Sequence, residues 1–333
     1  MKDPRIDLLA IGNAIVDVLA KTDEAFIARQ SKLYGMMKGA MTLIDERRAV
    51  ELYAEMPAGV ESSGGSAGNT IAGFASFGGK GAYIGKVAKD QLGEVFSHDL
   101  KAQGVVFKTQ PLAIGAPTAR CLILVTPDGN RTMNTFLGAA VELSPIDIDE
   151  ELVATSRITY LEGYLFDPPQ AKAAFRMASE LAHKAGRKIA LSLSDPFCVN
   201  RHRADFQDFV ENHVDILFAN EDEVMALYES ENFDDAVEAV KGACEIIVIT
   251  RGEKGSMIIA GDKKIGITPE VVAKVVDTTG AGDQYAAGFL YGYTQNMTLE
   301  TCGRLGSMAA AEVISHIGPR PAVRYADLIK KAA

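Results

Sequence analysis

The chain has 333 residues, of which 47% are hydrophobic and 23% are charged, and this composition excludes a disordered protein. The 34 Lys and Arg against 44 Asp and Glu give a formal net charge of −10, which argues against a protein that binds nucleic acid, because such binding depends on basic patches that neutralise phosphates. The length allows one large or two modest domains, each with a buried core.

Cysteine usage and hydropathy indicate the cellular compartment. The four cysteines stand far apart and form no Cys-x-x-Cys pair, so we expect reduced thiols rather than a disulfide framework or a zinc site. No run of 18 apolar residues occurs, so we expect no membrane association. Together these features favour a cytoplasmic protein.

Short apolar runs alternate with helical patterns along the chain, which is typical of a parallel sheet covered by helices on both faces. The predicted strands are Ile6–Ile11, Ala82–Val87, Ile158–Glu162, Lys188–Leu193, Val214–Ala219, Glu245–Thr250, Ser256–Ala260 and a strand-like Val271–Val276. The predicted helices are Asn69–Phe77, Gln91–Gln103, Gln170–Ala185, Glu221–Tyr228, Phe233–Lys241, Asp283–Tyr293 and Leu299–Ile314.

Two stretches interrupt this alternation. Asn13–Ser63 is interpreted as short strands around a helix, and Cys121–Phe136 as two strands joined by a turn. We expect the two stretches to form a small β-rich lid on one large α/β domain. The predicted lid comprises residues 13–63 and 121–137, and the large domain comprises residues 1–12, 64–120 and 138–333.

The strongest chemical signal is Asp277–Asp283, which reads Asp-Thr-Thr-Gly-Ala-Gly-Asp and precedes an apolar helix. Glycines at a helix start leave backbone N–H groups unshielded, and these groups together with the helix dipole form an anion site. Phosphoryl transfer suits such a site, because it needs positioning and stabilisation of charge. Asp283 is placed to accept a proton from an attacking hydroxyl; the alternative is that it only caps the helix.

The second signal is Gly64–Asn69, which reads Gly-Gly-Ser-Ala-Gly-Asn and formally satisfies the Gly-x-Ser-x-Gly pattern of serine hydrolases. That pattern requires a buried strand before the serine, and the preceding Glu61–Ser63 is not expected to form one. A hydrolase that uses Ser66 is therefore disfavoured. The glycines favour close approach of a ligand or a hinge, and Asn69 either caps the helix or binds a hydroxyl.

Three smaller features remain open to two interpretations. Asn220–Glu223 follows a buried strand and opens a helix, so its carboxylates are either ligands or dipole partners. Thr250–Gly255 joins two strands and is, by itself, an ordinary glycine-bearing turn. Asn13 and Asp17 interrupt an apolar segment, which indicates either turn chemistry or recognition of a hydroxyl.

The ordered set of these segments resembles the ribokinase/adenosine-kinase (PfkB-type) family of sugar and nucleoside kinases, over essentially the whole chain. The Walker A pattern is missing, and no Gly-x-Gly-x-x-Gly follows the first strand, which disfavours P-loop NTPases and simple dinucleotide dehydrogenases. The resemblance implies a ribokinase-like, Rossmann-type α/β sandwich with a mostly parallel central sheet. It also implies an ATP-dependent kinase that uses Mg²⁺ and often K⁺.

The resemblance assigns roles to residues that match the family's motifs. Asp283 would be the catalytic base, and the anion hole would be formed by Gly280, Ala281 and Gly282. The ATP side of the site would comprise Asn220, Glu223 (which would order Mg²⁺ through water), Thr250, Gly252 and Gly255. The acceptor side would comprise Asp17, Gly64 and Asn69, with Gly64 and Gly65 as the lid hinge. Asp277 and Thr279 match part of a potassium site.

Within the family, Gly12–Asp17 and Asp128–Ala140 look like the corresponding segments of adenosine kinases. This match implies that Asn13 approaches a purine, that Met133 and Leu137 pack on the base, and that Arg131 moves onto the ATP phosphates when the lid closes. An aromatic side chain from Tyr164–Phe166 is a further candidate for stacking on the purine. The expected reaction is therefore phosphorylation of adenosine to AMP, by a monomer or a homodimer.

Three alternatives stay open. Thr279 stands where eukaryotic adenosine kinases usually have Asn and many sugar kinases have Thr, so one alternative is a ribokinase-like enzyme that acts on a free pentose or hexose. A non-catalytic nucleoside-binding protein is a second alternative. The hydrolase that uses Ser66 is a third.

Overall fold

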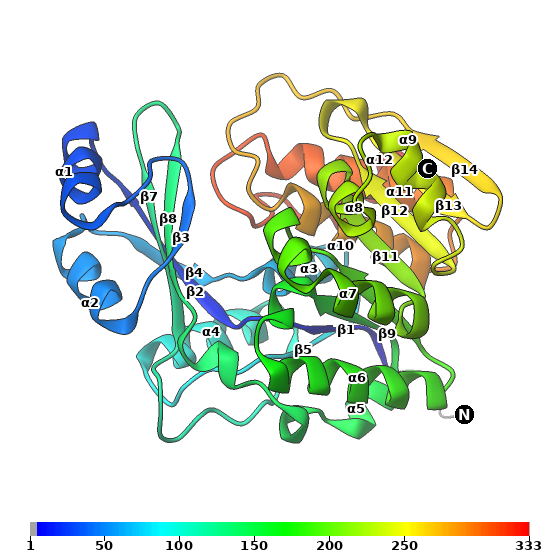
Figure 1. Cartoon of the computed structure of the whole chain (residues 1–333), viewed down its shortest axis with the longest axis horizontal. Coiled ribbons are helices and arrows are strands. Elements are labelled where there is room, and N and C mark those ends of the chain that lie inside the picture. The colour runs from blue at the N-terminus through cyan, green and yellow to red at the C-terminus, as the bar shows by residue number, and fades with distance from the viewer. Residues whose placement is uncertain (1–4, 333) are drawn as a thin grey trace.

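The computed structural model describes residues 5–332, so residues 1–4 and 333 of the predicted large domain lie outside it. Two sheets with their helices form the structure (Figure 1). The predicted α/β architecture, with a mostly parallel central sheet and a smaller sheet beside it, is confirmed. Where the chain divides into domains remains a prediction, although the small sheet draws its strands from residues 15–63 and 119–136.

The large sheet has nine strands in the order β14-β13-β12-β11-β10-β9-β1-β5-β6. Its strands are β1 (Ile6–Ile11), β5 (Gly81–Ile84), β6 (Val106–Phe107), β9 (Ser156–Glu162), β10 (Lys188–Ser192), β11 (Ile216–Asn220), β12 (Ile246–Thr250), β13 (Ser256–Ala260) and β14 (Lys263–Ile267). The neighbouring strands β6, β5, β1, β9, β10, β11 and β12 are all parallel, whereas β13 pairs antiparallel with both β12 and β14. Parallel strands need long crossovers, and helices supply them.

Helices cover both faces of the large sheet. The helices of this layered part are α3 (Ser66–Ser76), α4 (Gln91–Ala102), α5 (Glu150–Ala154), α6 (Pro169–Lys184), α7 (Pro196–His213), α8 (Glu221–Tyr228), α9 (Phe233–Val240), α10 (Ala281–Thr294), α11 (Leu299–Val313) and α12 (Ala326–Ala332). Because side chains alternate along a strand, Leu8 and Ala10 pack with α3, α4 and α10, whereas Leu9 and Ile11 pack with α6 and α7. The two buried clusters lie on opposite faces of β1 and hold the sheet rigid.

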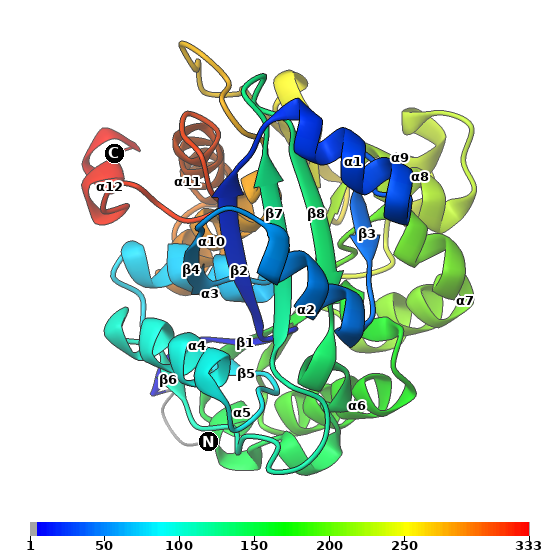
Figure 2. The same cartoon turned by 90° about the vertical axis from the view of Figure 1, so that its left-hand side faces the viewer.

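The small sheet has five strands in the order β3-β8-β7-β2-β4. Its elements are β2 (Ile15–Lys21), α1 (Glu24–Tyr34), β3 (Met41–Leu43), α2 (Glu46–Glu55), β4 (Val60–Ser63), β7 (Ala119–Val125) and β8 (Arg131–Phe136). Helices α1 and α2 cover its outer face (Figure 2), where Leu122 and Leu124 pack against Phe26 and Leu52. The opposite face carries Cys121 and, one pleat further along β7, Ile123, and it is turned towards the large sheet.

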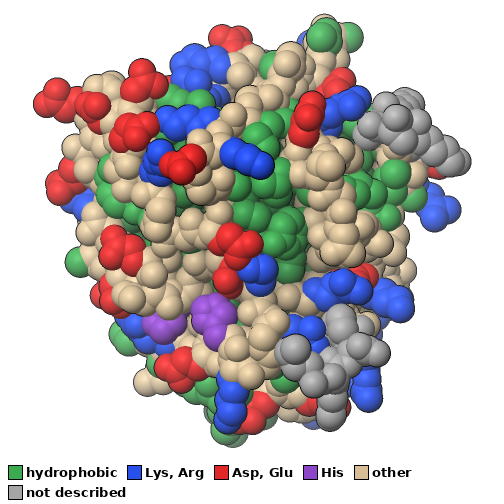
Figure 3. Space-filling view, turned by 90° about the vertical axis from the view of Figure 1, so that its right-hand side faces the viewer, with side chains coloured by type: hydrophobic (Ala, Val, Ile, Leu, Met, Phe, Trp, Pro, Cys, Tyr) green, Lys and Arg blue, Asp and Glu red, His purple; other side chains and the backbone are tan. Residues whose placement is uncertain are grey.

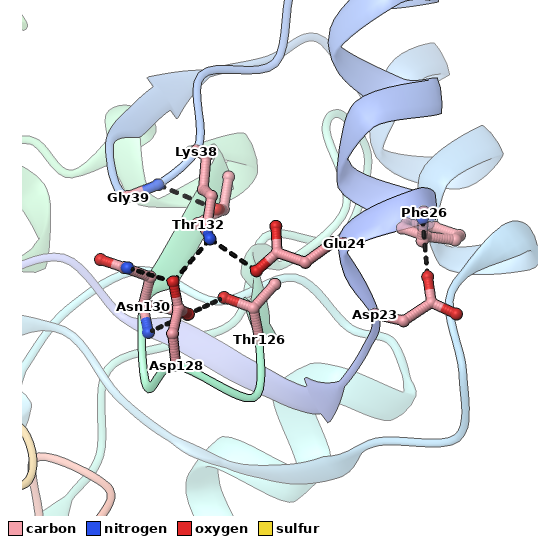
Figure 4. A network of polar contacts seen from close by, with 9 residues as sticks. All are labelled: Asp23, Glu24, Phe26, Lys38, Gly39, Thr126, Asp128, Asn130 and Thr132. Atoms are coloured by element: carbon pink, nitrogen blue, oxygen red, sulfur yellow. Dashed lines mark hydrogen bonds and ion pairs between the residues drawn. The ribbon is translucent and has the colours of Figure 1, made fainter.

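Polar contacts hold the turn between β7 and β8 against the loop that follows α1 (Figure 4). Lys38 Nζ lies 2.6 Å from Glu24 Oε1 and 2.6 Å from Asp128 Oδ2. Asp128 also accepts hydrogen bonds from the Thr126 hydroxyl at 2.6 Å and the Asn130 backbone N–H at 3.1 Å. These contacts fix the end of the hairpin immediately before β8 begins.

The surface facing away from the small sheet mixes acidic and basic side chains around a central group of hydrophobic side chains (Figure 3). The charges of both signs are interspersed on this face. Within residues 5–332, no helix combines the length and apolar character needed to cross a membrane.

Four sequence expectations differ from the structure. Val271–Val276 forms no strand: it is a connection in which Val271 is 97% exposed, and Val276 N–H binds the Ile314 carbonyl instead of a neighbouring strand. Helix α7 was not predicted, because it is kinked at His202 and its apolar residues form no continuous stripe. The segment 13–63 contains two helices rather than one, and the large sheet ends in β14, a strand that is absent from the predicted elements.

Candidate active site

A cavity of about 730 Å³ lies between the open face of the small sheet and the large sheet. Its floor is formed at the carboxyl ends of β9, β10, β11 and β12, which is where open α/β sheets bind ligands. The start of α10 forms one side, and apolar side chains of the small sheet form the other.

The start of α10 supplies an anion site. Gly280 precedes the helix with φ 78°, a left-handed conformation that favours glycine, and a Cβ there would lie 2.7 Å from Pro319 Cβ. Ala281 and Gly282 form the first turn and, with Gly280, line the cavity. The first N–H groups of a helix lack partners within the helix, so this turn presents backbone donors and the positive end of the dipole to a ligand.

Asp283 sits in this first turn, and both of its carboxylate oxygens are held. Ser66 Oγ donates to Oδ1 at 2.6 Å, and Asn69 Nδ2 donates to Oδ2 at 3.0 Å. Burial raises the pKa of Asp283 to about 6, although these two hydrogen bonds oppose the rise. Asp283 is therefore mostly ionised at neutral pH and is a stronger base than an ordinary carboxylate.

The role of Ser66 in the structure is to orient Asp283. Strand β4 precedes it, but this is a partly buried edge strand of the small sheet rather than the buried strand of a hydrolase elbow. None of the described residues that line the cavity is a histidine, so Ser66 has no imidazole base there.

Asp17 and the two hinge glycines meet at the edge of the small sheet. A Cβ on Gly64 would lie 2.4 Å from Asp17 Oδ2, and a Cβ on Gly65, which has φ 79°, would lie 2.2 Å from the Asn13 carbonyl oxygen. Glycine is therefore required at both positions by close approach. Burial raises the pKa of Asp17 to about 6, while Arg320 and Arg131 oppose the rise.

Asn13 is oriented by a carboxylate that the sequence analysis missed. Its Nδ2 donates to Glu162 Oε1 at 2.7 Å, and Glu162 Oε2 accepts the Ala67 backbone N–H at 2.8 Å. Burial raises the pKa of Glu162 to about 7. Glu162 ends a buried strand, and a carboxylate at the end of an apolar run is the sequence signal that could have identified it. This bond occupies one of the two Asn13 amide N–H groups, so the second N–H and the carbonyl oxygen are left to bind a ligand in the cavity.

Asn220 and Glu223 bind each other in a reciprocal helix cap. Glu223 Oε2 accepts the Asn220 backbone N–H at 2.9 Å, and Asn220 Oδ1 accepts the Glu223 backbone N–H at 2.8 Å. Burial raises the pKa of Glu223 to about 7. Both residues and Thr250 line the cavity, whereas Gly252 and Gly255 only shape the neighbouring turn with φ 57° and 84°.

The described residues contain no group of three or more His, Cys, Asp or Glu arranged to hold a metal ion. The buried carboxylate of Glu223, facing the cavity, is chemically suited to bind the water shell of a Mg²⁺ ion that arrives on nucleotide phosphates. The site thus fits Mg²⁺ as part of the nucleotide complex rather than as a separate protein-held ion.

Arg131 lies on Asp277, outside the cavity lining. Its Nη2 is 2.6 Å from Asp277 Oδ2, and both side chains are 6% exposed. Asp277 also accepts hydrogen bonds from the Gly318 backbone N–H at 2.9 Å and from both the backbone N–H and the hydroxyl of Thr279, at 3.0 and 2.8 Å. The carboxylate and hydroxyl oxygens are of the kind that bind K⁺, but a cation fits here only if Arg131 leaves.

Apolar side chains exposed to the cavity form its second wall. Met133 and Leu137, which the sequence comparison assigns to the acceptor side, line the cavity. Met41 and Leu43 of β3 line it as well, and they are 44% and 55% exposed. Across the cavity, Phe197 at the start of α7 is 76% exposed. Exposed apolar surface inside a cavity is typical of a binding site for a flat organic ligand.

Arg320 lies beside the site, and the sequence pattern does not single it out. Its guanidinium donates to Asn69 Oδ1 at 2.9 Å, to the Ser63 carbonyl at 2.7 Å and to Gln103 Oε1 at 3.2 Å. It lowers the pKa values of Asp17 and Asp283. Its partners lie more than 200 residues away in the sequence. The only local signal for Arg320 is therefore its place between two prolines.

A family model described as pfkB family carbohydrate kinase matches residues 32–324. Adenosine kinase from Saccharomyces cerevisiae is 28% identical over 94% of this chain and 96% of its own length.

Two solved structures are similar over nearly their whole length. Adenosine kinase from Sinorhizobium meliloti is 52% identical, superposes with a TM-score of 0.91, and is matched over 99% of this chain and 100% of its own. A probable sugar kinase from Rhizobium etli CFN 42 is 47% identical with a TM-score of 0.91, over 99% of both chains.

Proposed function

Since this chain belongs to the pfkB family of carbohydrate kinases, we propose that it transfers the γ-phosphate of ATP to the 5′-hydroxyl of a nucleoside, with adenosine as the preferred acceptor. The observation that carries this proposal is Asp283, whose two oxygens are held in the first turn of α10 beside the backbone donors of Gly280–Gly282. A base and an anion site stand together in a cavity that also has a long apolar wall.

The transfer follows from this geometry. Asp283 accepts the proton of the acceptor hydroxyl while the hydroxyl oxygen forms a bond to the γ-phosphorus, and the bond between that phosphorus and the β,γ-bridging oxygen breaks, so that ADP leaves with the electron pair. The N–H groups at Gly280–Gly282 stabilise the charge on the transferred group. Bound with ATP, Mg²⁺ would neutralise charge on the phosphates, and Glu223 would hold its water ligands.

The acceptor side of the cavity suits a nucleoside. Asp17 and Asn69 can bind ribose hydroxyls, and the free carbonyl oxygen of Asn13 can accept a hydrogen bond from an exocyclic amine. Met133 and Leu137, with the apolar side chains of β3, would cover the faces of a purine. A free sugar would leave this apolar wall in contact with water, which is why a nucleoside is the better fit.

Arg131 and Asp277 supply a conformational step in this proposal. Arg131 would leave Asp277 and bind the ATP phosphates when the small sheet closes, and Asp277 and Thr279 would then be free to hold K⁺. Arg131→Met is expected to lower kcat by on the order of 10³-fold, because an arginine that stabilises transferred phosphate contributes about that much. Arg29→Met, an exposed arginine of α1, is the control; equal kcat in both variants would contradict the step.

A sugar kinase is the second candidate. The Rhizobium etli neighbour is described as a probable sugar kinase, and Thr279 is the residue that many sugar kinases have before the Gly-Ala-Gly-Asp turn. A non-catalytic binding protein is the weaker candidate, because a binding protein has no need of a base with both oxygens oriented.

The experiment is to incubate the protein with Mg-ATP and adenosine and to separate the products by chromatography. Equal amounts of ADP and AMP are expected, and none above the buffer level with 5′-deoxyadenosine, which lacks only the accepting hydroxyl. ADP without AMP, or equal ADP from 5′-deoxyadenosine, would contradict the proposal.

A further inference from the structure

The segment that follows α11 folds back across the start of α10. The Pro319 carbonyl accepts a hydrogen bond from Gln284 Nε2 at 2.8 Å, and Pro319 packs on Gly280 so closely that a Cβ there would lie 2.7 Å away. Prolines on both sides restrict the backbone of Arg320. Arg320 is therefore held at a set position relative to the turn that carries Asp283.

The guanidinium of Arg320 joins three elements. Its Nε donates to Asn69 Oδ1 of α3 at 2.9 Å, its Nη2 donates to the carbonyl and hydroxyl of Ser63 at 2.7 and 3.1 Å, and its Nη1 donates to Gln103 Oε1 at 3.2 Å. Ser63 is the last residue of β4, directly before the hinge glycines. One side chain thus binds the small sheet, the helix that follows the hinge and the end of α4.

The contact with Asn69 decides how that amide is oriented. A guanidinium has only donors, so the amide oxygen of Asn69 must face Arg320. The amide NH₂ group is then left to face Asp283, to which it donates at 3.0 Å. If the amide turned over, donors would face donors at Arg320 and the amide oxygen would face the Asp283 carboxylate. Arg320 therefore selects the orientation that supports an ionised Asp283.

Arg320 also acts through its positive charge on the acidic side chains around Asp283. The titratable groups that face Asp283 are Asp17 on β2, Tyr160 and Glu162 on β9, Tyr164 in the turn after β9, Glu223 on α8 and Arg320. The three carboxylates disfavour a further negative charge, and the tyrosines are neutral at physiological pH. Arg320 opposes the carboxylates and favours the ionised form of both Asp283 and Asp17.

We propose that Arg320 is a positioning residue for the phosphoryl transfer. Arg320 orients Asn69, and Asn69 in turn holds Asp283 as a carboxylate directed at the acceptor hydroxyl. This inference rests on the proposed function, because it assigns Arg320 a part in that transfer. Arg320 touches neither the acceptor nor the phosphates in this account, and its effect passes through Asn69 and through its charge.

The test compares Arg320→Met with Arg320→Lys in the full chain. Arg320→Met removes the charge and all donors, so kcat is expected to fall by about tenfold or more, as for loss of a hydrogen bond to a charged group. The acidic limb of the kcat–pH profile should move up by about one pH unit, because an opposite charge near a carboxylate is lost. Gln103→Ala, which removes only the Nη1 partner, should leave both quantities unchanged.

Arg320→Lys separates charge from geometry. It keeps the charge, so the acidic limb should stay at the wild-type pH, but it cannot bind Asn69 and Ser63 together, so kcat should fall by about threefold or more. A wild-type kcat or a displaced limb in Arg320→Lys would overturn the proposal, and this variant decides the matter if Arg320→Met does not fold. An unmoved limb in a folded Arg320→Met would overturn it as well.

A readout without turnover keeps this inference separate from the proposed function. If the wild-type protein phosphorylates no acceptor, the proposed function fails, and the titration of the Asp283 carboxyl is followed by ¹³C NMR in the wild type and in Arg320→Met. A higher titration midpoint in the variant supports the arrangement of Arg320, Asn69 and Asp283. An unchanged midpoint overturns it.

Discussion

At the residue scale, the proposed reaction depends on one carboxylate. Asp283 has both oxygens occupied by neutral donors, Ser66 and Asn69, so its direction is set without neutralising its charge. Its pKa of about 6 comes from burial. This combination of an oriented, basic and still ionised carboxylate suits a general base at neutral pH.

The substitution Asp283→Asn keeps the shape of the side chain and removes its basicity. We expect kcat to fall by on the order of 10²–10⁴-fold, which is the usual contribution of a general base, with a small change in KM for ATP. Steady-state ADP release measures the effect. Asp262→Asn, whose carboxylate is 99% exposed, is the matched control, and a wild-type kcat in Asp283→Asn would remove Asp283 from its role.

The activity should depend on pH through the same group. Asp283 must be deprotonated to accept a proton, and its raised pKa of about 6 places the loss of kcat below about pH 6 rather than near pH 4. A kcat–pH profile between pH 4.5 and 8, at constant ionic strength, tests this with adenosine at saturation. Constant kcat down to about pH 4.5 would exclude Asp283 as the base.

Some site residues were accessible from sequence and others were not. The turn Asp277–Asp283 is contiguous, so its glycines and its aspartate could be predicted as an anion site with a base. Glu162 and Arg320 act through partners 95 to 257 residues away, and only the folded chain brings these together. The position of Arg131 on Asp277 likewise depends on how the small sheet lies over α10.

At the element scale, Gly64 and Gly65 join the small sheet to helix α3, which packs on the large sheet. The absence of side chains there lets the chain pass against Asp17 and the Asn13 carbonyl. The same two glycines connect β4 to α3, which carries Ser66 and Asn69. If these glycines act as the proposed hinge, a movement of the small sheet would reach the partners of Asp283 through them.

Gly64→Ala tests this coupling. The added Cβ would lie 2.4 Å from Asp17 Oδ2, so either the carboxylate or the chain must shift. We expect kcat/KM for the nucleoside to fall by about tenfold or more, since small misplacements at a reacting site are costly. Gly266→Ala on β14, where a Cβ meets nothing within 4 Å, is the control. Equal kcat/KM in the two variants would show that the hinge tolerates a side chain.

The element pattern was predictable where local chemistry decides it. The seven strands predicted before Val271 all appear in the large sheet, because each is a short apolar run between turn residues. Val271–Val276 has the same composition but forms no strand, since the antiparallel strand β14 ends the sheet before it. Helix α7 could not be predicted from its apolar pattern, because the helix is kinked at His202 and is stabilised by tertiary packing.

At the scale of the whole molecule, four buried carboxyls hold protons more tightly in the folded chain than in the unfolded chain. Burial raises the pKa to about 6 in Asp17 and Asp283 and to about 7 in Glu162 and Glu223. Between about pH 5 and pH 7 these four carboxyls therefore bind more protons in the folded state than in the unfolded state. Groups with lowered pKa values act in the opposite sense, namely His213 and, below about pH 5, the carboxyls of Asp128, Asp167, Asp208, Glu221 and Glu238.

Stability without ligands should accordingly decrease as the pH rises. The contribution of the four carboxyls is fully present below their unfolded pKa values and is lost as the pH rises through about 6 to 7. The melting temperature is expected to fall between about pH 5 and pH 8, and to fall less in Asp283→Asn. Thermal unfolding at constant ionic strength measures both; a melting temperature that rises over this range would contradict the charge states assigned to the site.

The proposed acceptor site is lined by several elements, so the choice of acceptor is a property of the assembled cavity. The base, the anion site and the hydroxyl-binding carboxylate serve any alcohol acceptor, whereas the apolar wall of β3 and β8 serves only an acceptor with a flat apolar part. Discrimination between a nucleoside and a free sugar therefore reports on the small sheet.

The most direct test is a competition among acceptors. Adenosine, ribose and fructose are supplied together at equal concentration with limiting Mg-ATP, and the phosphorylated products are quantified by mass spectrometry. AMP should exceed each sugar phosphate by about 10²-fold, since contact of the base with the apolar wall contributes to kcat/KM only for the nucleoside. A predominance of ribose phosphate or fructose phosphate would contradict the account, because the apolar wall would then have no part in acceptor choice.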